Sequence, residues 1–334
     1  MKNDDVSFAN LVESYFTQRL IKQRQASPNT IASYRDSFCL LLRFVQEHLR
    51  KHPSLLHLRD IDAPVIAAFL ENMEKSRSIS TRTRNARLVA IRSFFRYAAL
   101  EVPTHAGQIQ RVLAIPSQRQ TRALVSFLTK DELEALLDAP NRSTWSGKRD
   151  HVFLLVAIQT GLRLSELTGL QLRNLSLSNG AHVRVIGKGR KERMIPLTKP
   201  TVAVLKAWKR DLTSQDDDAI LFPTIRGGRM SPDAVQHLVK KHISKAEKSC
   251  PTIAGKQITP HSLRHSLAMS LLAAGIDRAM IALWLGHESV ETTQMYLHAS
   301  LEMKEEMLSK TTFVDGKKGR YRPDDQLLAF LKSL

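Results

Sequence analysis

Cysteine is scarce in this sequence, and long apolar runs are missing from it. The two cysteines, Cys39 and Cys250, fall one in each half of a chain of 334 residues. Such a pair excludes a disulfide framework and a cysteine-ligated zinc site, and favours two reduced or buried thiols. No run reaches the roughly 18 apolar residues of a membrane-spanning helix, and the acidic start MKNDDVSFAN lacks the apolar centre of a secretory signal peptide. We therefore expect a cytoplasmic protein without a membrane partner.

Acidic residues are also in short supply. The chain has 32 Asp and Glu residues against 50 Lys and Arg residues, which gives a formal net charge of +18. Residues 1–127 contain 19 basic and 10 acidic residues, so the two parts of the chain each carry about +9. This excess predicts a polyanionic partner, and its even distribution predicts two domains that grip one double-stranded DNA.

The sequence also lacks a glycine-rich phosphate loop. The segment GKGRK at residues 187–191 does not have the spacing of a nucleotide-binding loop, and there is no internal repeat or low-complexity tract. Hydrophobic residues nevertheless make up 43% of the chain, enough for well-packed cores. The length predicts two domains of roughly 100–200 residues each. We expect neither a cofactor nor a small-molecule substrate.

The first hundred residues predict an all-helical domain. Apolar residues recur at helical spacing in four segments, namely residues 8–20, 31–49, 62–75 and 80–100. In the fourth segment the apolar residues share one face, and the other side carries Arg82, Asn85, Arg92 and Arg96. Such a polar stripe is often just a solvated helix face. Because the sequence from residue 76 to residue 100 is so poor in acidic residues, we favour DNA contact.

A linker is predicted at residues 114–126, between one domain at 1–113 and a second at 127–334. Helical periodicity fades after residue 100, and Thr129-Lys-Asp-Glu132 then has the form of a capping box that opens a new helix. Further helices are predicted near residues 149–158, from 165, and at 200–212, 232–247, 260–274, 277–285 and 290–309. Short strands are predicted at residues 175–179, 182–187 and 191–197. The expected fold class is mainly α with one small antiparallel β-sheet.

Several polar clusters of the second domain carry residue types that suit chemistry on a phosphate. They are TGLRLSEL, the turn GKG, HSLRH, LGHES and the tyrosine of TTQMYLH. Each cluster alone is a weak signal, because a lone Arg usually lies on the surface and a lone Tyr usually packs in a helix. Their order and spacing together resemble the tyrosine recombinases, the phage integrases and Xer-type enzymes, whose signature runs Arg, Lys, His-x-x-Arg, His or Trp, and Tyr.

This resemblance is strong over about residues 128 to 300, whereas the first domain resembles that family's core-binding domain in size, helicity and charge. It implies a site-specific DNA recombinase that cuts and rejoins strands through a 3′-phosphotyrosyl intermediate and a Holliday junction. It also implies the catalytic residues Arg163, Lys188, His261, Arg264, His287 and Tyr296.

The chemistry of phosphodiester exchange suits the implied roles of the basic residues. The reaction passes through a state with extra negative charge on the non-bridging oxygens, so fixed donors are needed there. The guanidinium groups of Arg163 and Arg264 stay protonated and bind phosphate oxygens as a fork. His261 lies one helical turn before Arg264, so it can donate to the same phosphate and help to take the proton from Tyr296.

Tyr296 is the implied nucleophile, and Lys188 is the candidate general acid. A free phenol has a pKa of about 10, so Tyr296 must lose its proton as it attacks, and nearby cations favour the phenolate. Lys188, in a turn between two predicted strands, can protonate the departing 5′ oxygen. Because the phosphotyrosyl bond keeps the energy of the broken bond, rejoining needs neither ATP nor a metal.

Two further residues have competing interpretations. Glu166 lies one turn after Arg163 and either orients that arginine or is an ordinary carboxylate near a helix N-terminus. His265 stands four residues after His261, a spacing that also suits a zinc site with His287 and His298 as further ligands. We favour no metal, because the motif His-Glu-x-x-His is missing and the arginine between the two histidines repels a dication.

The apolar C-terminal tail favours the assembly of several copies of the chain. Its apolar residues are Leu327, Leu328, Phe330, Leu331 and Leu334. They either fold back onto their own domain or, as is common in the family, dock on a neighbouring protomer and close a ring of four. We favour a homotetramer on two DNA sites, with a dimer or monomer on each site before they pair. A recombinase of a mobile element is the favoured role; dimer resolution of chromosomes or plasmids, type IB topoisomerase-like relaxation and non-catalytic DNA binding stay open.

Overall fold

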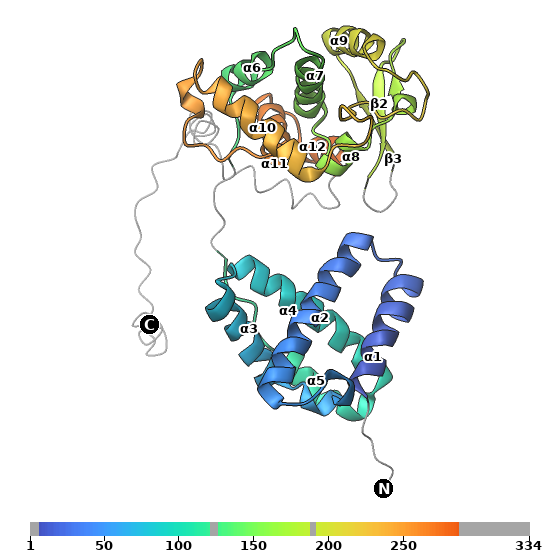
Figure 1. Ribbon diagram of the computed structural model, residues 1–334, viewed down its shortest axis with the longest axis vertical. Helices are drawn as coiled ribbons and strands as arrows, with labels where there is room; N and C mark the ends of the chain where they lie inside the picture. Colours follow the sequence, from blue (N-terminus) through green and yellow to red (C-terminus); the bar gives the residue numbers. More distant parts are fainter. Residues whose placement is uncertain (1–6, 121–125, 188–191, 287–334) are drawn as a thin grey trace, which may run out of the picture. The chain divides into compact units, whose positions relative to one another are not determined.

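The computed structural model describes residues 7–120, 126–187 and 192–286 (Figure 1). The chain divides into two compact units, Met1–Arg122 and Ala123–Leu334. Three of the predicted catalytic residues lie outside the described residues, namely Lys188, His287 and Tyr296. The helix predicted at residues 290–309 and the apolar tail lie outside them as well.

Unit 1 is helical, as the sequence predicted. Its elements are α1 (Phe8–Ser14), the π-helix η1 (Tyr15–Gln23), α2 (Pro28–Leu49), α3 (Ala63–Arg77), α4 (Thr81–Glu101) and α5 (Ala106–Leu113). The longer helices begin where polar side chains cap them, because Ser27, Asp62 and Ser80 each accept a hydrogen bond from a backbone amide three residues onward. These caps fix the helix starts that the sequence pattern indicated.

Aromatic rings form the centre of the unit 1 core. Phe94 of α4 meets Phe8 of α1 and Phe38 of α2 at ring centroid distances of 5.3 Å, both edge to face. Tyr15 is buried among these rings and its hydroxyl donates to Ser93 Oγ at 2.7 Å. Burial raises the pKa of Tyr15 to about 12, so its hydroxyl stays protonated in the core. The apolar face of α4 therefore packs into this core, whereas Arg82 and Arg96 of the same helix are exposed.

The helix α5 and the true start of α7 (Trp145–Thr160) are differences from the sequence prediction. Periodicity fades after residue 100, yet α5 forms because Ile109 and Val112 are both fully buried. Two apolar residues are too few for a recognisable pattern. The helix α7 begins at Trp145 rather than near residue 149, because the side chain of Thr144 caps it by accepting from the amide of Gly147.

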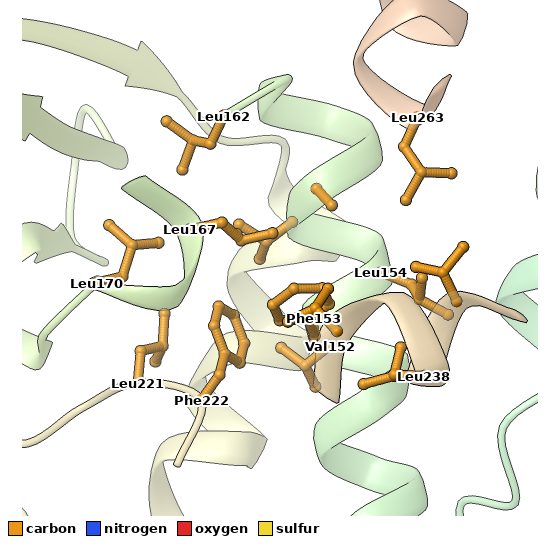
Figure 2. Close-up of a cluster of buried hydrophobic side chains, with 14 of the residues drawn as sticks. Val152, Phe153, Leu154, Leu162, Leu167, Leu170, Leu221, Phe222, Leu238 and Leu263 are labelled. Carbon is orange, nitrogen blue, oxygen red and sulfur yellow. The ribbon is translucent and has the colours of Figure 1, made fainter. Parts of the chain in front are cut away.

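Unit 2 is organised around α7. The helices α6 (Lys130–Asp138), α9 (Lys199–Arg210) and α11 (Pro260–Ala273) contact α7, and α10 (Pro232–Ala246) packs on α6 and α11. Figure 2 shows Val152, Phe153 and Leu154 of α7 within the buried core. The capping box predicted at the start of α6 is present, since Glu132 Oε2 accepts from the amide of Thr129 at 2.8 Å. The short helices α8 (Leu164–Thr168) and α12 (Arg278–Leu285) complete the described part of unit 2.

A three-stranded antiparallel sheet lies in unit 2, in the order β1-β2-β3. The strands are β1 (Leu175–Ser176), β2 (His182–Ile186) and β3 (Glu192–Pro196), so β1 is shorter than the predicted 175–179. Val183 pairs with Ile195, and both face the core. The fold class is therefore mainly α with one small antiparallel sheet, which confirms the prediction. No described helix has the length and apolar character needed to cross a membrane.

Candidate active site

The position of Arg163 depends on the way α7 ends. Gly161 caps α7 in the left-handed conformation, with φ of 61°. A side chain at this position is disfavoured for two reasons. The left-handed backbone is strained for any residue other than glycine, and an added Cβ would lie 2.6 Å from Leu285 Cδ2 and 2.8 Å from Leu267 Cδ2. The chain can thus turn sharply, and Arg163 becomes the N-cap residue of α8.

Arg264 reaches the same region from α11. This helix begins at residue 260, where the sequence predicted its start, with Pro260 in its first turn behind the cap residue Thr259. The Arg264 residue is only 2% exposed, so its charge needs partners inside the protein. Its two terminal nitrogens donate to the carbonyl oxygens of Gly161 and Leu285, each at 2.6 Å.

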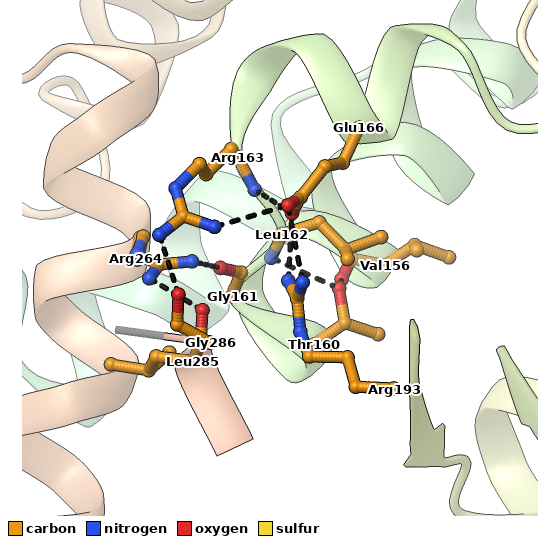
Figure 3. A network of polar contacts seen from close by, with 10 residues as sticks. All are labelled: Val156, Thr160, Gly161, Leu162, Arg163, Glu166, Arg193, Arg264, Leu285 and Gly286. Atoms are coloured by element: carbon orange, nitrogen blue, oxygen red, sulfur yellow. Dashed lines mark hydrogen bonds and ion pairs between the residues drawn. The ribbon is translucent and has the colours of Figure 1, made fainter. Parts of the chain in front are cut away.

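The two arginines converge on the end of α12, as Figure 3 shows. Arg163 Nη2 donates to the carbonyl oxygen of Gly286 at 2.6 Å, and Arg264 Nη2 donates to that of Leu285. A helix C-terminus carries partial negative charge, which favours cations there. Two guanidinium groups are therefore held side by side, and the segment that holds them leads directly into His287.

Glu166 contacts the side chain of Arg163 and also closes the capping box at the start of α8, so the contacts of both its interpretations are present. Its carboxylate accepts from the amide of Arg163 at 2.8 Å and from Arg163 Nη1 at 3.1 Å. It also accepts two hydrogen bonds from Arg193, which the sequence reasoning did not single out. Burial raises the pKa of the Glu166 carboxyl, but the hydrogen bonds from Arg193 and from the Arg163 amide outweigh this effect and hold the pKa below its usual value. Glu166 is thus an ionised group between two arginines.

His261 and Arg163 both line a cavity of about 620 Å³. Arg229, Ser165 and Ser231 contribute further donor groups to its wall. A cavity lined by the guanidinium groups of Arg163 and Arg229, an imidazole and hydroxyls suits a phosphate group of DNA. Of the six predicted catalytic residues, the structure describes three. Arg163 and His261 line this cavity, and Arg264 shares the end of α12 with Arg163 without forming part of the cavity wall.

The zinc alternative involves two histidines of α11, His261 and His265. The rings of His261 and His265 lie close, with centroids 4.3 Å apart. Within residues 7–120, 126–187 and 192–286, no group of three or more His, Cys, Asp or Glu side chains could hold a metal ion. The other two ligands of this alternative, His287 and His298, lie outside those ranges.

The basic face predicted on α4 is used in two ways. Arg82 and Arg96 are exposed. Asn85 instead exchanges two hydrogen bonds with the backbone of Gln118, at 2.9 and 3.1 Å. Arg92 donates to the carbonyl oxygen of Ile115 and to Ser117 Oγ. Two of the four predicted DNA-binding side chains therefore hold the protein's own segment 115–118, and no sequence pattern indicated this pairing.

Two family models match most of the chain. The one described as Phage integrase family matches residues 126–303, and the one described as Phage integrase, N-terminal SAM-like domain matches residues 14–101. A protein of Sinorhizobium fredii, named as the integrase/recombinase y4rC, is 60% identical over 328 residues, with 98% of each chain covered. The tyrosine recombinase XerC of Pelobacter propionicus is 32% identical, covering 88% of this chain and 93% of the relative.

Solved structures share the fold at lower identity. The XerH site-specific recombinase bound to a palindromic difH substrate superposes with a TM-score of 0.67 at 22% identity, covering 92% of this chain and 91% of that one. The Tn1549 transposon integrase in complex with transposon right end DNA also gives 0.67, at 16% identity, over 91% and 99% of the two chains. At these identities the likeness concerns the fold.

Proposed function

This chain belongs to the phage integrase family of tyrosine recombinases, and it is a site-specific recombinase that breaks and rejoins DNA strands. We propose that six of its residues carry out this reaction. They are Arg163, Lys188, His261, Arg264, His287 and Tyr296. The observation that carries the proposal is the convergence of Arg163 and Arg264 on adjacent carbonyls, beside a cavity that Arg163 shares with His261.

In this proposal the scissile phosphate binds in that cavity. Arg163 and Arg264 neutralise the charge that grows on the non-bridging oxygens, and their bonds to backbone carbonyls fix them before DNA arrives. Preorganised donors of this kind need no reorientation during the reaction, which is why they lower its barrier. His261 and His287 donate to the same phosphate.

The covalent step exchanges one phosphoester bond for another. The Tyr296 oxygen attacks the phosphorus and loses its proton to His261, while the bond to the 5′ oxygen breaks and Lys188 protonates that oxygen. The product is a 3′-phosphotyrosyl link and a 5′-hydroxyl. Attack by the 5′-hydroxyl of another strand reverses these steps and releases Tyr296.

Trapping of the covalent complex tests the nucleophile. The DNA carries a nick close to the cleavage site, so that the short fragment with the new 5′-hydroxyl diffuses away after cleavage. We expect a covalent protein–DNA band with the wild-type chain and none with Tyr296→Phe. Tyr321→Phe, from the same C-terminal stretch, is the matched control and should form the band normally. A band with Tyr296→Phe at the wild-type level contradicts the assignment.

Double-stranded DNA is the partner, and unit 1 offers a surface for it. We propose that the exposed side chains Arg82 and Arg96 of α4 contact backbone phosphates, whereas Asn85 and Arg92 serve the segment 115–118. The net charge of +18 supplies the attraction that is independent of sequence.

We further propose a homotetramer in which the apolar tail of one copy docks on unit 2 of the next. A cavity of about 590 Å³ supports this, because its wall is largely apolar and includes Leu133, Ile158, Leu197, Leu267 and Trp284. Apolar side chains from another protomer would remove that wall from water. Deletion of residues 323–334 should abolish tetramers on paired sites and leave cleavage of a single nicked site. An unchanged tetramer with normal strand exchange rejects this contact.

The recombinase of a mobile element is the role that we propose. Support comes from the relative named as an integrase/recombinase and from the fold shared with the Tn1549 transposon integrase. Mapping of the bound sites in cells should place them at the ends of a mobile element. A single chromosomal site would favour dimer resolution instead. Holliday junctions between two sites separate both roles from topoisomerase-like relaxation, which needs one DNA molecule.

A further inference from the structure

Arg193 stands outside the six-residue signature, yet it is joined to the site. It is the second residue of β3 and therefore follows the turn that contains Lys188. Its side chain is only 12% exposed and reaches Glu166 of α8 with two hydrogen bonds, Nη1 to Oε1 at 3.1 Å and Nη2 to Oε2 at 2.7 Å. This is the bidentate geometry in which an arginine fixes the plane of a carboxylate. We propose that Arg193 is a positioning residue of the strand exchange, which holds Glu166 so that Glu166 holds Arg163 in place.

The pattern of bonds on Glu166 shows how this works. Each carboxylate oxygen accepts one hydrogen bond from Arg163 and one from Arg193. The Glu166 side chain is 7% exposed, so a rotation away from these donors would leave a buried charge without partners. Arg193 restricts the rotation of the Glu166 side chain, and the fixed Glu166 carboxylate in turn restricts the position of the Arg163 guanidinium.

The charges of the three side chains lead to the same conclusion. Two guanidinium groups face one carboxylate, so the cluster keeps one net positive charge beside the proposed phosphate cavity. Without Arg193, Glu166 would neutralise Arg163 completely. The cluster would then lose much of its attraction for the charge that develops on the phosphate.

Arg193 also packs against the end of α12. A Cβ added to Gly286 would lie 2.9 Å from Arg193 Nη1 and 3.0 Å from its Cζ, so the guanidinium lies directly against the Gly286 backbone. The carbonyl oxygen of Gly286 accepts from Arg163. Arg193, Glu166, Arg163 and Gly286 therefore form a closed ring of contacts that links β3, α8 and the segment before His287. Figure 3 shows the hydrogen bonds of this ring.

The first test compares cleavage rates on nicked DNA at saturating DNA. Arg193→Met should cleave roughly ten to a hundred times more slowly, because misplacement of a catalytic group by about 1 Å costs about that much. Arg193→Lys keeps the charge and should recover part of the loss. The control Arg184→Met lies on β2 in a half-exposed ion pair with Glu192 and should cleave at the wild-type rate. Unchanged cleavage by Arg193→Met, or a loss confined to DNA affinity, overturns the proposal.

The second test asks whether Arg193 acts through Glu166. The double variant Arg193→Met, Glu166→Gln should cleave about as slowly as the slower single variant, because both changes break the same link. Losses that multiply overturn the proposal. If Arg193→Met fails to fold, the same comparison is made with Arg193→Lys.

This inference rests on the proposed function, and the two can fail separately. If Tyr296→Phe forms no covalent complex and Arg193→Met still cleaves at the wild-type rate, only the role of Arg193 is wrong. If Tyr296→Phe still forms the complex, the proposed nucleophile is wrong whatever Arg193 does.

Discussion

At the scale of single residues, Gly161 shows how the site depends on one backbone conformation. It ends α7 in the left-handed region, and its carbonyl oxygen anchors Arg264. A larger residue would strain the backbone and press against Leu285 and Leu267 at once. One glycine therefore joins the fold of unit 2 to the placement of Arg264, a proposed catalytic residue.

Gly161→Ala is expected to lower both stability and activity. The left-handed conformation alone costs an alanine about 1–2 kcal/mol of unfolding free energy, and the contact with Leu285 adds to this. Displacement of the Gly161 carbonyl should also slow cleavage. The control is Gly180→Ala, since Gly180 has a similar φ of 73° but open space around its Cβ position. Urea denaturation and cleavage of nicked DNA measure both variants, and equal losses in the two would contradict the packing part of the argument.

Asp150 is a buried acid that the proposed mechanism does not use. It accepts from His242 Nε2 at 2.9 Å and from Arg149 at 2.7 Å, and so ties α7 to α10. Burial raises the pKa of the Asp150 carboxyl, but the hydrogen bonds from His242 and Arg149 outweigh this effect and hold the pKa below its ordinary value of 3.8. The pair therefore stabilises the fold in the ionised form of Asp150.

Asp150→Asn should lower the free energy of unfolding at pH 7 by about 2 kcal/mol, the size of a hydrogen bond to a charged group. Because the folded pKa of Asp150 is lowered, this difference should persist from pH 7 to about pH 4 and shrink only as the pH falls through the folded pKa. Denaturation with urea along a pH series measures it. Asp138→Asn, in an exposed pair with Arg142, should change little. A difference that already shrinks between pH 7 and pH 5 would show that the Asp150 pKa is raised instead.

At the scale of elements, α4 holds the chain that leaves unit 1. Asn85 and Arg92 of this helix hold Ile115, Ser117 and Gln118 through backbone and side-chain groups. A helix face that looks like a DNA-binding stripe in the sequence thus fixes residues 115–118, a few residues before unit 2 begins.

Hydrogen exchange checks this contact directly. The amide of Gln118 donates to Asn85 Oδ1, so Asn85→Ala should raise its exchange rate about fivefold, the effect of one hydrogen bond of about 1 kcal/mol. Mass spectrometry of peptides that cover residues 114–120 measures the change. Arg96→Ala, exposed on the same helix, should leave the exchange as it is. Equal exchange in wild type and Asn85→Ala would mean that the segment is not held in solution.

At the scale of the whole molecule, charge governs how strongly the protein holds DNA. The net charge of +18 is spread over both units, so DNA affinity should fall steeply as salt rises. Lysines and arginines that touch phosphates each release about one counterion, which makes the salt dependence a count of such contacts.

Arg82→Glu combined with Arg96→Glu should weaken DNA binding and reduce the slope of log affinity against log salt by about two. Fluorescence anisotropy at several salt concentrations measures this slope. The control Arg35→Glu alters an exposed arginine of α2 that pairs with Asp36, and should leave the slope nearly unchanged. If the double variant keeps the wild-type slope, this face of α4 does not contact phosphate.

The sequence by itself determined the helical content, the small sheet, the polyanionic partner and the identity of the chemistry. Helical spacing and the capping box that begins at Thr129 are local signals, because they arise among residues a few positions apart. The motif residues could be found because their order and spacing resemble those of the tyrosine recombinases. Elements with few apolar residues, such as α5, left no comparable pattern.

Only the tertiary structure decided how these residues meet. Arg163 and Arg264 converge on the end of α12 because three helices pack together, and Arg193 reaches Glu166 because the sheet lies beside α8. The capture of segment 115–118 by α4 is likewise a contact between residues distant in the chain. Such pairings follow from the packing of whole elements. The sequence alone does not distinguish a basic residue that binds DNA from one that binds a carboxylate or the backbone of a distant segment of the same chain.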